Sequence, residues 1–229
     1  MDNITNFTGQ DIYEKLKDDI LTLRIRPGEK ISENELCERF NVSRTPIRGA
    51  FQRLDTEGLI SIEPYKGTYV SLLDFNEIEQ LIYMRYAIEA AVLRDFINNF
   101  DQMAVEKIRY RIRQQEVLLG SDFRAEQFYE LDAKLHSIWF EHTGRERLWS
   151  LINTTQAGYT RFRMLDIVVV KNFRQILNEH LQLFDAICSK DIKKIEEQTK
   201  NHVYGGIGRL SEKIKTEFVD YFVFEGKIS

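Results

Sequence analysis

The sequence predicts a mainly α-helical protein in two parts: three short helices with a small β-hairpin, followed by an all-helical bundle. The prolines support this division, because Pro27, Pro46 and Pro64 all lie in the first part and none follows. Proline lacks an amide donor and clashes with the preceding helical turn, so the proline-free remainder can form a long series of helices. The 229 residues are enough for two domains, which we expect at 1–74 and 75–229.

The N-terminal helices are predicted from apolar spacing and from helix-start signals. Apolar residues recur at helical spacing over 12–23. Ser32 and Glu35 have the spacing of a capping box, which predicts the start of a second helix. Ser43 is a candidate cap for a third helix, with Pro46 in its first turn, where a missing amide proton costs little.

Two short strands are predicted after these helices. The segments 59–62 and 68–71 are rich in β-branched and aromatic residues, and 63–67 joins them with proline and glycine. Three helices followed by a hairpin are the order of elements in a winged helix-turn-helix, so we expect the first part to bind DNA.

The third helix has the two faces that a recognition helix needs. Ile47, Phe51 and Leu54 form an apolar stripe. The expected DNA contacts on and around the opposite face are Ser43, Arg44, Thr45, Arg48 and Gln52, with Lys66 and Gly67 at the wing tip. Arginine can pair with guanine O6 and N7, while hydroxyls and helix-start amides suit phosphate oxygens. We therefore expect double-stranded operator DNA as a partner.

The overall charge does not by itself indicate a DNA-binding protein. The formal net charge is −4, yet residues 39–54 carry four arginines and no acidic residue. The alternative is a solvated helix face, which an isolated charge cluster would favour. The order of three helices, a capped third helix and a wing reverses that preference.

The first part resembles the GntR family of regulators over about residues 10–72. The resemblance rests on four runs: Pro27–Glu33, Val42–Arg48, Glu57–Ile60 and Lys66–Val70. It implies that Arg44, Thr45, Arg48 and Gly67 contact the operator. The chain has Gly49 where the family usually has glutamate, and Asn34 at an often basic position, so we expect a weaker DNA contact from Asn34.

Helical patterns in the second part cover 75–99, 101–120, 123–143, 145–165, 171–189 and 191–213. The stretch 217–224 is rich in aromatic and β-branched residues and is left open. Cys37 and Cys188 lie in apolar helical patterns, which predicts buried thiols rather than a disulfide. The chain has neither a long apolar run nor a basic, apolar N-terminus, so we expect a cytoplasmic protein without a membrane partner.

Polar residues occur on apolar helix faces in this bundle. Asp132 and His136 are four residues apart and share an apolar stripe, and His180 and His202 also occur among apolar residues. Buried carboxylate and imidazole groups are costly unless something satisfies them, and a transition metal would do so. Spacing alone favours the alternative, which is a set of hydrogen-bonded core histidines.

The second part is similar to the FCD domain of the FadR subgroup of this family. Its motifs are Arg85-x3-Glu89, Asp132-x3-His136, Glu141–Gly144, Glu179-His180 and His202. The resemblance implies that Asp132, His136, His180 and His202 hold a divalent transition metal, zinc or nickel, and that His142 lies outside the site. It also implies a small carboxylate effector, for which Arg85, Arg161 and Arg163 are candidate partners. Ordinary salt bridges are the alternative for these arginines.

Together these features predict a homodimeric transcriptional regulator, a repressor whose operator affinity an effector controls. Two alternatives remain: a metal-dependent enzyme fused to a DNA-binding module, and a metal-free ligand sensor. Four metal ligands with open positions can activate water. Glu89 and Glu130 are available as acid or base, but both have structural explanations. We therefore expect no enzyme activity.

Overall fold

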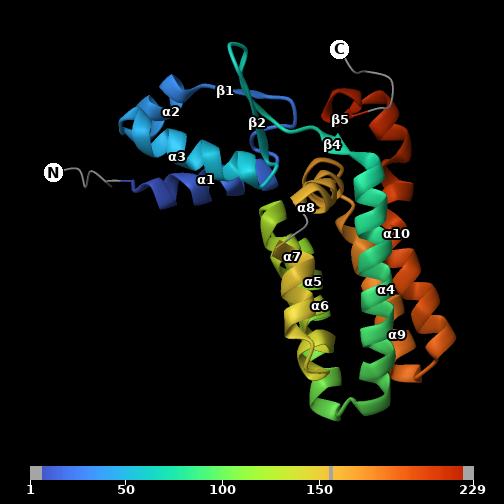
Figure 1. Ribbon diagram of the computed structural model, residues 1–229. Helices are drawn as coiled ribbons and strands as arrows, with labels where there is room; N and C mark the ends of the chain where they lie inside the picture. Colours follow the sequence, from blue (N-terminus) through green and yellow to red (C-terminus); the bar gives the residue numbers. More distant parts are fainter. Residues whose placement is uncertain (1–6, 155–156, 224–229) are drawn as a thin grey trace. The chain divides into compact units, whose positions relative to one another are not determined.

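The computed structural model describes residues 7–154 and 157–223, which form two compact units (Figure 1). The helical unit spans Asn76–Lys215, and the N-terminal unit runs to Phe75 and also includes the segment from Thr216 onward. The sequence assigns that last segment to the helical part. It groups with the N-terminal unit because strand β5 (Phe222–Val223) pairs in parallel with strand β4 (Leu73–Asp74). The ring of Phe222 also meets that of Phe75 edge-on.

The N-terminal unit has the predicted three helices and hairpin. Its further elements are α1 (Gly9–Leu21), β1 (Lys30–Ile31), α2 (Glu33–Phe40), α3 (Arg44–Thr56), β2 (Ile60–Glu63) and β3 (Gly67–Val70). The strand β1 was not predicted, and it completes an antiparallel sheet of order β1-β3-β2. A winged helix-turn-helix is therefore confirmed.

The helix starts agree in part with the sequence. A capping box formed by Thr8 and Asp11 begins α1. The Ser32 hydroxyl accepts the Glu35 amide at 3.4 Å, which is one half of the predicted box. Ser43 occupies the N-cap position of α3, but its side chain makes no capping bond, so that expectation was wrong. Its hydroxyl is exposed at the helix start instead.

The second unit consists of long helices around an apolar core. Its elements are α4 (Phe75–Asn99), α5 (Gln102–Leu119), α6 (Ala125–His142), α7 (Glu146–Thr154), α8 (Ala157–Met164), a π-helix (Leu165–Val169), α9 (Phe173–Ser189) and α10 (Ile192–Thr216). One helix was predicted over 145–165, where the structure has α7, α8 and the start of the π-helix, with 155–156 outside the described residues. The stretch left open at 217–224 has a 3₁₀ turn, Val219–Tyr221, before β5, and residue 224 lies outside the described part.

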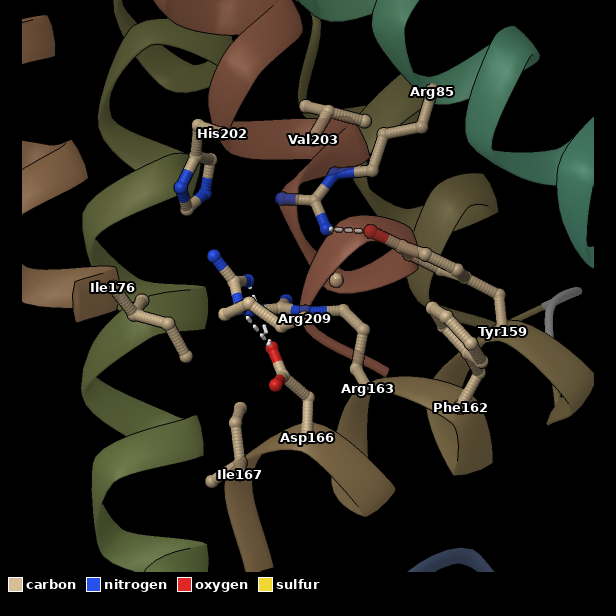
Figure 2. A pocket seen from close by; sticks show the side chains of 11 residues that line it. Arg85, Tyr159, Phe162, Arg163, Asp166, Ile167, Ile176, His202, Val203 and Arg209 are labelled. Carbon is tan, nitrogen blue, oxygen red and sulfur yellow. Dashed lines mark hydrogen bonds and ion pairs between the residues drawn. The ribbon is translucent and has the colours of Figure 1, made fainter. Parts of the chain in front are cut away.

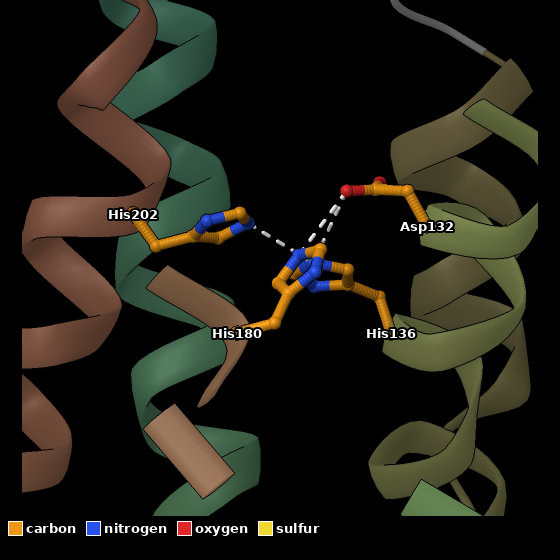
Figure 3. A group of neighbouring side chains, drawn as sticks. All are labelled: Asp132, His136, His180 and His202. Atoms are coloured by element: carbon orange, nitrogen blue, oxygen red, sulfur yellow. Dashed lines mark hydrogen bonds and ion pairs between the residues drawn. The ribbon is translucent and has the colours of Figure 1, made fainter. Parts of the chain in front are cut away.

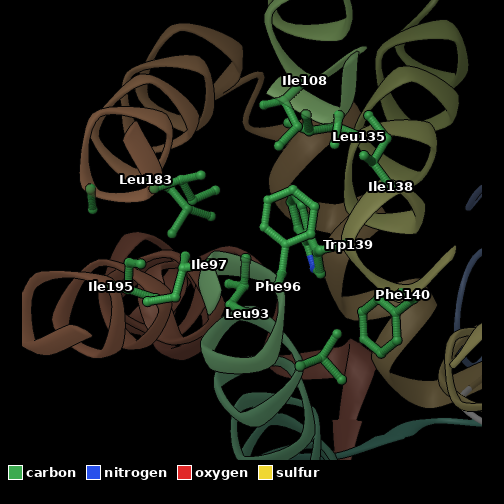
Figure 4. Packing of buried hydrophobic residues seen from close by; sticks show 14 of the residues in the cluster. Leu93, Phe96, Ile97, Ile108, Leu135, Ile138, Trp139, Phe140, Leu183 and Ile195 are labelled. Carbon is green, nitrogen blue, oxygen red and sulfur yellow. The ribbon is translucent and has the colours of Figure 1, made fainter. Parts of the chain in front are cut away.

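An apolar core packs the helices of the second unit against one another. Phe96, Leu135, Trp139 and Leu183 are almost fully buried and come from α4, α6 and α9 (Figure 4). The π-helix matters because such irregular turns are frequent at functional sites. Among the described residues, no helix combines the length and apolarity that a membrane span requires.

The two thiols depart from their predicted burial. Cys37 is half-buried and Cys188 is exposed. The buried stripe of α9 runs through Leu183, Ala186 and Ile187, and the next residue along the helix turns away from it. A cysteine in an apolar pattern was therefore not sufficient evidence for a buried thiol.

Candidate DNA-binding surface and candidate metal centre

The outer face of α3 is exposed and carries the predicted DNA contacts. Arg44, Thr45, Arg48 and Gln52 are exposed, whereas the inner face of the helix is buried. Arg44 Nη2 donates to Asn34 Oδ1 at 3.0 Å, so the side chain from α2 meets the recognition helix. Arg48 Nε donates to the Glu33 carboxylate at 3.2 and 3.1 Å.

These polar contacts are easily exchanged for others. The Arg48 side chain is 60% exposed, and an ion pair with such access to water contributes at most about 1 kcal/mol to folding. A DNA phosphate or a base edge can therefore replace Glu33 as its partner at little cost to the fold. Nothing in the structure explains the choice of glycine at the exposed position Gly49.

The wing requires its glycine. Gly67 has φ +140, and a Cβ there would lie 2.7 Å from Cε of Lys30. Lys66 is exposed beside it and pairs with Glu63 at 3.2 Å. The sequence reasoning did not include Tyr65, a fully exposed aromatic residue at the tip with φ +65. Its place between proline and Lys66-Gly67 was the available signal.

The structure brings the four predicted metal ligands together inside the helical unit. Asp132 and His136 come from α6, His180 from α9 and His202 from α10 (Figure 3). All four are buried, and one ligand atom from each lies within 4.8 Å of the others. Helix packing thus supplies the convergence that sequence spacing could not establish.

Each histidine is oriented by an oxygen on its Nδ1 side. His136 Nδ1 contacts the carboxylate of Glu89. His180 Nδ1 lies 2.8 Å from Gln115 Oε1, and His202 Nδ1 lies 3.0 Å from Glu179 Oε2. Because these oxygens accept hydrogen bonds, the protons are assigned to Nδ1. All three Nε2 atoms then carry lone pairs, as in histidines that bind metal.

The four inward-facing ligand atoms, three Nε2 atoms and Asp132 Oδ1, have lone pairs but no proton to donate to one another. Nε2 of His136 lies 3.1 Å from Nε2 of His202, and Nε2 of His180 lies 3.3 Å from Asp132 Oδ1. Asp132 Oδ1 and His180 Nε2 are buried atoms without a hydrogen-bond partner. Buried polar atoms are normally satisfied, and lone pairs that face one another are the arrangement that a cation site requires.

The separations also fit a metal. Zinc binds imidazole nitrogen at about 2.0–2.1 Å, so two ligand atoms of one ion lie about 3–3.5 Å apart. Two of the observed separations, 3.1 and 3.3 Å, are of this size, whereas His136 Nε2 and Asp132 Oδ1 lie 4.0 Å apart. Three imidazoles with one carboxylate are a donor set suited to zinc or nickel. The residues present therefore fit the group.

Electrostatics favour the protonation states that metal ligands need at Asp132 and His202. Burial opposes ionisation of Glu89, but His136 and Arg85 outweigh it and lower the pKa to about 2. Burial likewise opposes ionisation of Asp132, and the guanidinium of Arg163 holds its pKa well below the usual value. Burial lowers the pKa of His202 far below 6.5, with the neighbouring imidazoles adding to the effect. Ionised carboxylates and neutral imidazoles are the ligand forms.

A small cavity of about 20 Å³ adjoins His202 (Figure 2). Two of the three predicted effector arginines line it. Arg85 donates to Glu89 at 3.0 Å and to the Tyr159 hydroxyl at 2.6 Å. Arg163 Nη2 donates to Asp132 Oδ2 at 2.7 Å, which leaves the other oxygen of that carboxylate facing the histidines.

Arg161 does not belong to this lining. Its side chain is buried, and burial lowers its pKa to about 10, against the opposing effect of Glu77. Its role as an effector residue remains a prediction that the cavity does not support. His142 is exposed at the end of α6, where its ring contacts the Asn99 carbonyl, and it lies outside the cluster.

No role in this site was assigned from the sequence to Arg209, Asp166, Glu179 or Gln115. Arg209 lines the cavity and binds Asp166 at 2.8 Å, and it also contacts Glu179. Burial raises the pKa of Glu179 to about 7, with Asp166 adding to the effect and Arg209 opposing it. Two signals were available: Arg209 follows His202 by seven residues on the same helix face, and Gln115 interrupts an apolar stripe.

A winged helix-turn-helix with an exposed arginine-bearing helix, in one chain with a helical bundle, defines a DNA-binding transcriptional regulator. The model of bacterial regulatory proteins of the gntR family matches residues 8–70, and the FCD domain model matches 80–205. The chain belongs to the GntR family, with an FCD domain in its second part. GntR regulators bind DNA and typically dimerise, and FCD domains commonly bind metal.

The relatives are regulators of similar length. The HTH-type transcriptional repressor RspR of Escherichia coli K12 is 30% identical, covering 96% of each chain. The uncharacterized regulator YdhC of Bacillus subtilis is 24% identical, covering 89% of each. Family and relatives are transcriptional regulators and not enzymes, so the alternative of a fused metalloenzyme is set aside.

Solved structures share the fold. E. coli McbR/YncC has a TM-score of 0.66 at 16% identity and covers 93% of this chain and 99% of its own. A GntR regulator from Rhodococcus sp. RHA1 has a TM-score of 0.65 at 19% identity, covering 89% of this chain and 97% of its own. At these identities the likeness shows the fold alone.

Proposed function

We propose that this transcriptional regulator is a homodimeric repressor, controlled by a small carboxylate effector at a zinc or nickel site in the helical unit. The proposal depends on one observation above all. Three Nδ1 atoms are held by oxygens, so three Nε2 atoms and Asp132 Oδ1 converge as lone-pair donors. His136, His180, His202 and Asp132 would hold the metal, which would supply the positive charge that binds a carboxylate.

The DNA-binding half of the proposal assigns roles to the exposed face. Arg44 and Arg48 project from α3 and would read base edges, with Thr45, Gln52 and Asn34 beside them. The Ser43 hydroxyl at the helix start, and Lys66 and Gly67 at the wing, would contact phosphate or the minor groove. Two such surfaces in a dimer match a palindromic operator, because the half-sites then repeat with the same symmetry.

The effector half requires that the ligand distinguishes two states of the protein. A ligand changes operator affinity only if it binds the DNA-competent and DNA-incompetent states unequally. The cavity connects the cluster to α8 and the π-helix through Tyr159–Arg85 and Arg163–Asp132. A ligand carboxylate that replaces Asp132 as the partner of Arg163 would change the contact that links α8 and the π-helix to the cluster. This segment is therefore a candidate for the part of the protein that differs between the two states.

Metal content tests the proposal first. Elemental analysis of protein purified without chelator or nickel resin should give about one transition metal per chain, and His180→Ala should lose it. His142→Ala is the matched control, because this histidine is exposed and outside the cluster. If neither wild type nor protein reconstituted with zinc, nickel or manganese holds metal, the metal site is wrong and a metal-free sensor replaces it.

Operator binding tests the remainder. Selection from random duplexes with the wild-type chain should yield a palindromic sequence, and a dimer should bind it. Small carboxylates should weaken that binding only in the metal-loaded protein. An effect of equal size in His180→Ala would show that the acids act elsewhere.

A further inference from the structure

The cavity beside His202 has two ends of opposite electrostatic character. Arg209 lies two helical turns after His202 on α10, about 10 Å along the axis. The end at His202 adjoins the four-ligand cluster. The other end is formed by Arg209 with Asp166 from the π-helix, and Figure 2 shows this pair facing the same space as Arg85 and Arg163.

At the cluster end, the charges of the protein side chains cancel in pairs. Arg85 is paired with Glu89 at 3.0 Å, and Arg163 with Asp132 at 2.7 Å. The charge of a bound divalent ion is therefore not neutralised by these four groups. Arg85 and Arg163 also present guanidinium groups to the cavity. This end suits a carboxylate.

At the other end, acceptors outnumber donors. Arg209 is shared between two carboxylates, Asp166 at 2.8 Å and Glu179. Asp166 Oδ1 accepts from Asn172 at 2.7 Å, and its Oδ2 accepts twice from Arg209. A carboxylate has about four acceptor positions, so one remains. A second carboxylate of a ligand would be the third acid on one guanidinium, whereas a hydroxyl or ammonium group would find an acceptor.

We infer that the effector is a monocarboxylate whose chain carries a hydrogen-bond donor, a hydroxyl or an ammonium group, and that Asp166 selects it against dicarboxylates. This inference rests on the proposed function, since it names the class of acid that the same site takes. The free volume of about 20 Å³ holds little more than one water, so Phe162 or Arg163 must shift to admit the ligand. Gly206 faces Phe162 at 3.2 Å from where a Cβ would lie, which leaves no spare room on that side.

A ligand series with one variable group tests this selection. Butyrate, 4-hydroxybutyrate, 4-aminobutyrate and succinate share a carboxylate and chain length and differ at the far carbon. Propionate, 3-hydroxypropionate, β-alanine and malonate repeat the comparison with a shorter chain. Calorimetry and thermal shift on the full zinc-loaded chain should show binding at least about tenfold tighter for the donor-bearing acid than for the alkyl acid or the diacid.

Two variants separate the role of Asp166 from general damage. Asp166→Asn keeps an acceptor oxygen but removes the charge, so the preference over the diacid should fall to within about threefold while metal content is unchanged. Glu130→Gln is the control, because that carboxylate is exposed on α6 and does not line the cavity.

The outcomes distinguish this inference from the proposed function. Equal or tighter binding of succinate and malonate overturns the inference and leaves a metal-dependent carboxylate site in place. Loss of all binding by metal-loaded protein to both series overturns the carboxylate effector itself, and the inference with it. An unchanged preference in Asp166→Asn, with the metal retained, removes Asp166 as the selecting group.

Discussion

The arginines of the two units differ in their exposure and in how firmly their partners hold them. Arg48 in the N-terminal unit is 60% exposed and forms an ion pair with Glu33 at the solvent-exposed surface. Arg85 in the helical unit is 2% exposed and is held by Glu89 and the Tyr159 hydroxyl. An exposed guanidinium can exchange its partner for DNA. A buried one cannot lose its partner without a large cost, because its charge has no access to water.

The difference explains where mutations should affect folding and where they should affect binding. Buried pairs around the cluster contribute fixed geometry, and removing one member leaves an uncompensated charge. Exposed pairs on α3 contribute little to folding, since water and salt replace them readily. Variants in the buried pairs should therefore have the largest effect on folding, and variants in the exposed pairs the smallest.

Glu89→Gln should produce the largest loss of stability. It leaves Arg85 buried without its carboxylate and weakens the bonds to His136 and to the Trp139 indole, which donates at 3.1 Å. Removal of one partner from a buried pair costs about 3–5 kcal/mol. Urea unfolding followed by tryptophan fluorescence measures this directly, because Trp139 and Trp149 are the only tryptophans of the chain and both lie in the helical unit.

The matched control for this change is Glu130→Gln on α6. That glutamate side chain is 65% exposed and lies 3.8 Å from Lys134, so its loss should cost below about 0.5 kcal/mol. If the two variants unfold at the same urea concentration, the buried charge pairs do not stabilise the helical unit.

Arg48→Ala should affect DNA binding and leave folding almost unchanged. Loss of a paired contact to a base costs about 1–3 kcal/mol, so operator affinity should fall about 10- to 100-fold while the free energy of unfolding changes little. Fluorescence anisotropy with a selected operator measures the affinity. Arg109→Ala on α5 is the control, because that arginine is also exposed and paired with one glutamate. Equal weakening by both variants would indicate a general charge effect rather than base recognition.

The two units also differ in how much of each could be predicted from the sequence. The exposed face of α3 was predictable because its residues lie within one continuous stretch, where helix periodicity fixes which side chains point outward. The four cluster residues were identified one by one, but their convergence depends on packing of α6, α9 and α10. Gln115 and Glu179 orient histidines from other parts of the chain, and local spacing carries no information on such pairings. The stretch that contains strand β5 was left open for the same reason, since its partner β4 is distant in sequence.

Asp19 in the N-terminal unit lies between the buried and the exposed pairs, because its buried carboxylate forms ion pairs with exposed cations. Burial opposes its ionisation, but Arg24, Arg39 and Lys15 lower its pKa below the usual value. A lowered folded-state pKa means that the stabilisation is complete above the unfolded pKa of about 3.9 and disappears as pH falls through the folded value. Asp19→Asn should therefore cost about 1–2 kcal/mol near neutral pH and progressively less below about pH 4.

Hydrogen exchange of peptides from α1 is the suitable measurement, because tryptophan fluorescence reports the other unit. The comparison is made between wild type and variant at each pH. A difference that stays constant down to about pH 2 would contradict the role of the ionised carboxylate.

Glu33→Gln should have the smallest effect on folding and yet change DNA binding. The Arg48 pair is exposed, so the free energy of unfolding should change by less than about 0.5 kcal/mol. In the proposed role of Arg48, Glu33 would compete with DNA for the guanidinium and repel nearby phosphates. Its neutralisation should therefore tighten operator binding about two- to tenfold at low salt, with a smaller gain at high salt. Anisotropy titrations at two salt concentrations, with Glu106→Gln as the control that releases Arg109, measure both. Weaker binding by Glu33→Gln would mean that this carboxylate orients Arg48 toward the base. The exposed pair would then fix side-chain geometry, as the buried pairs do.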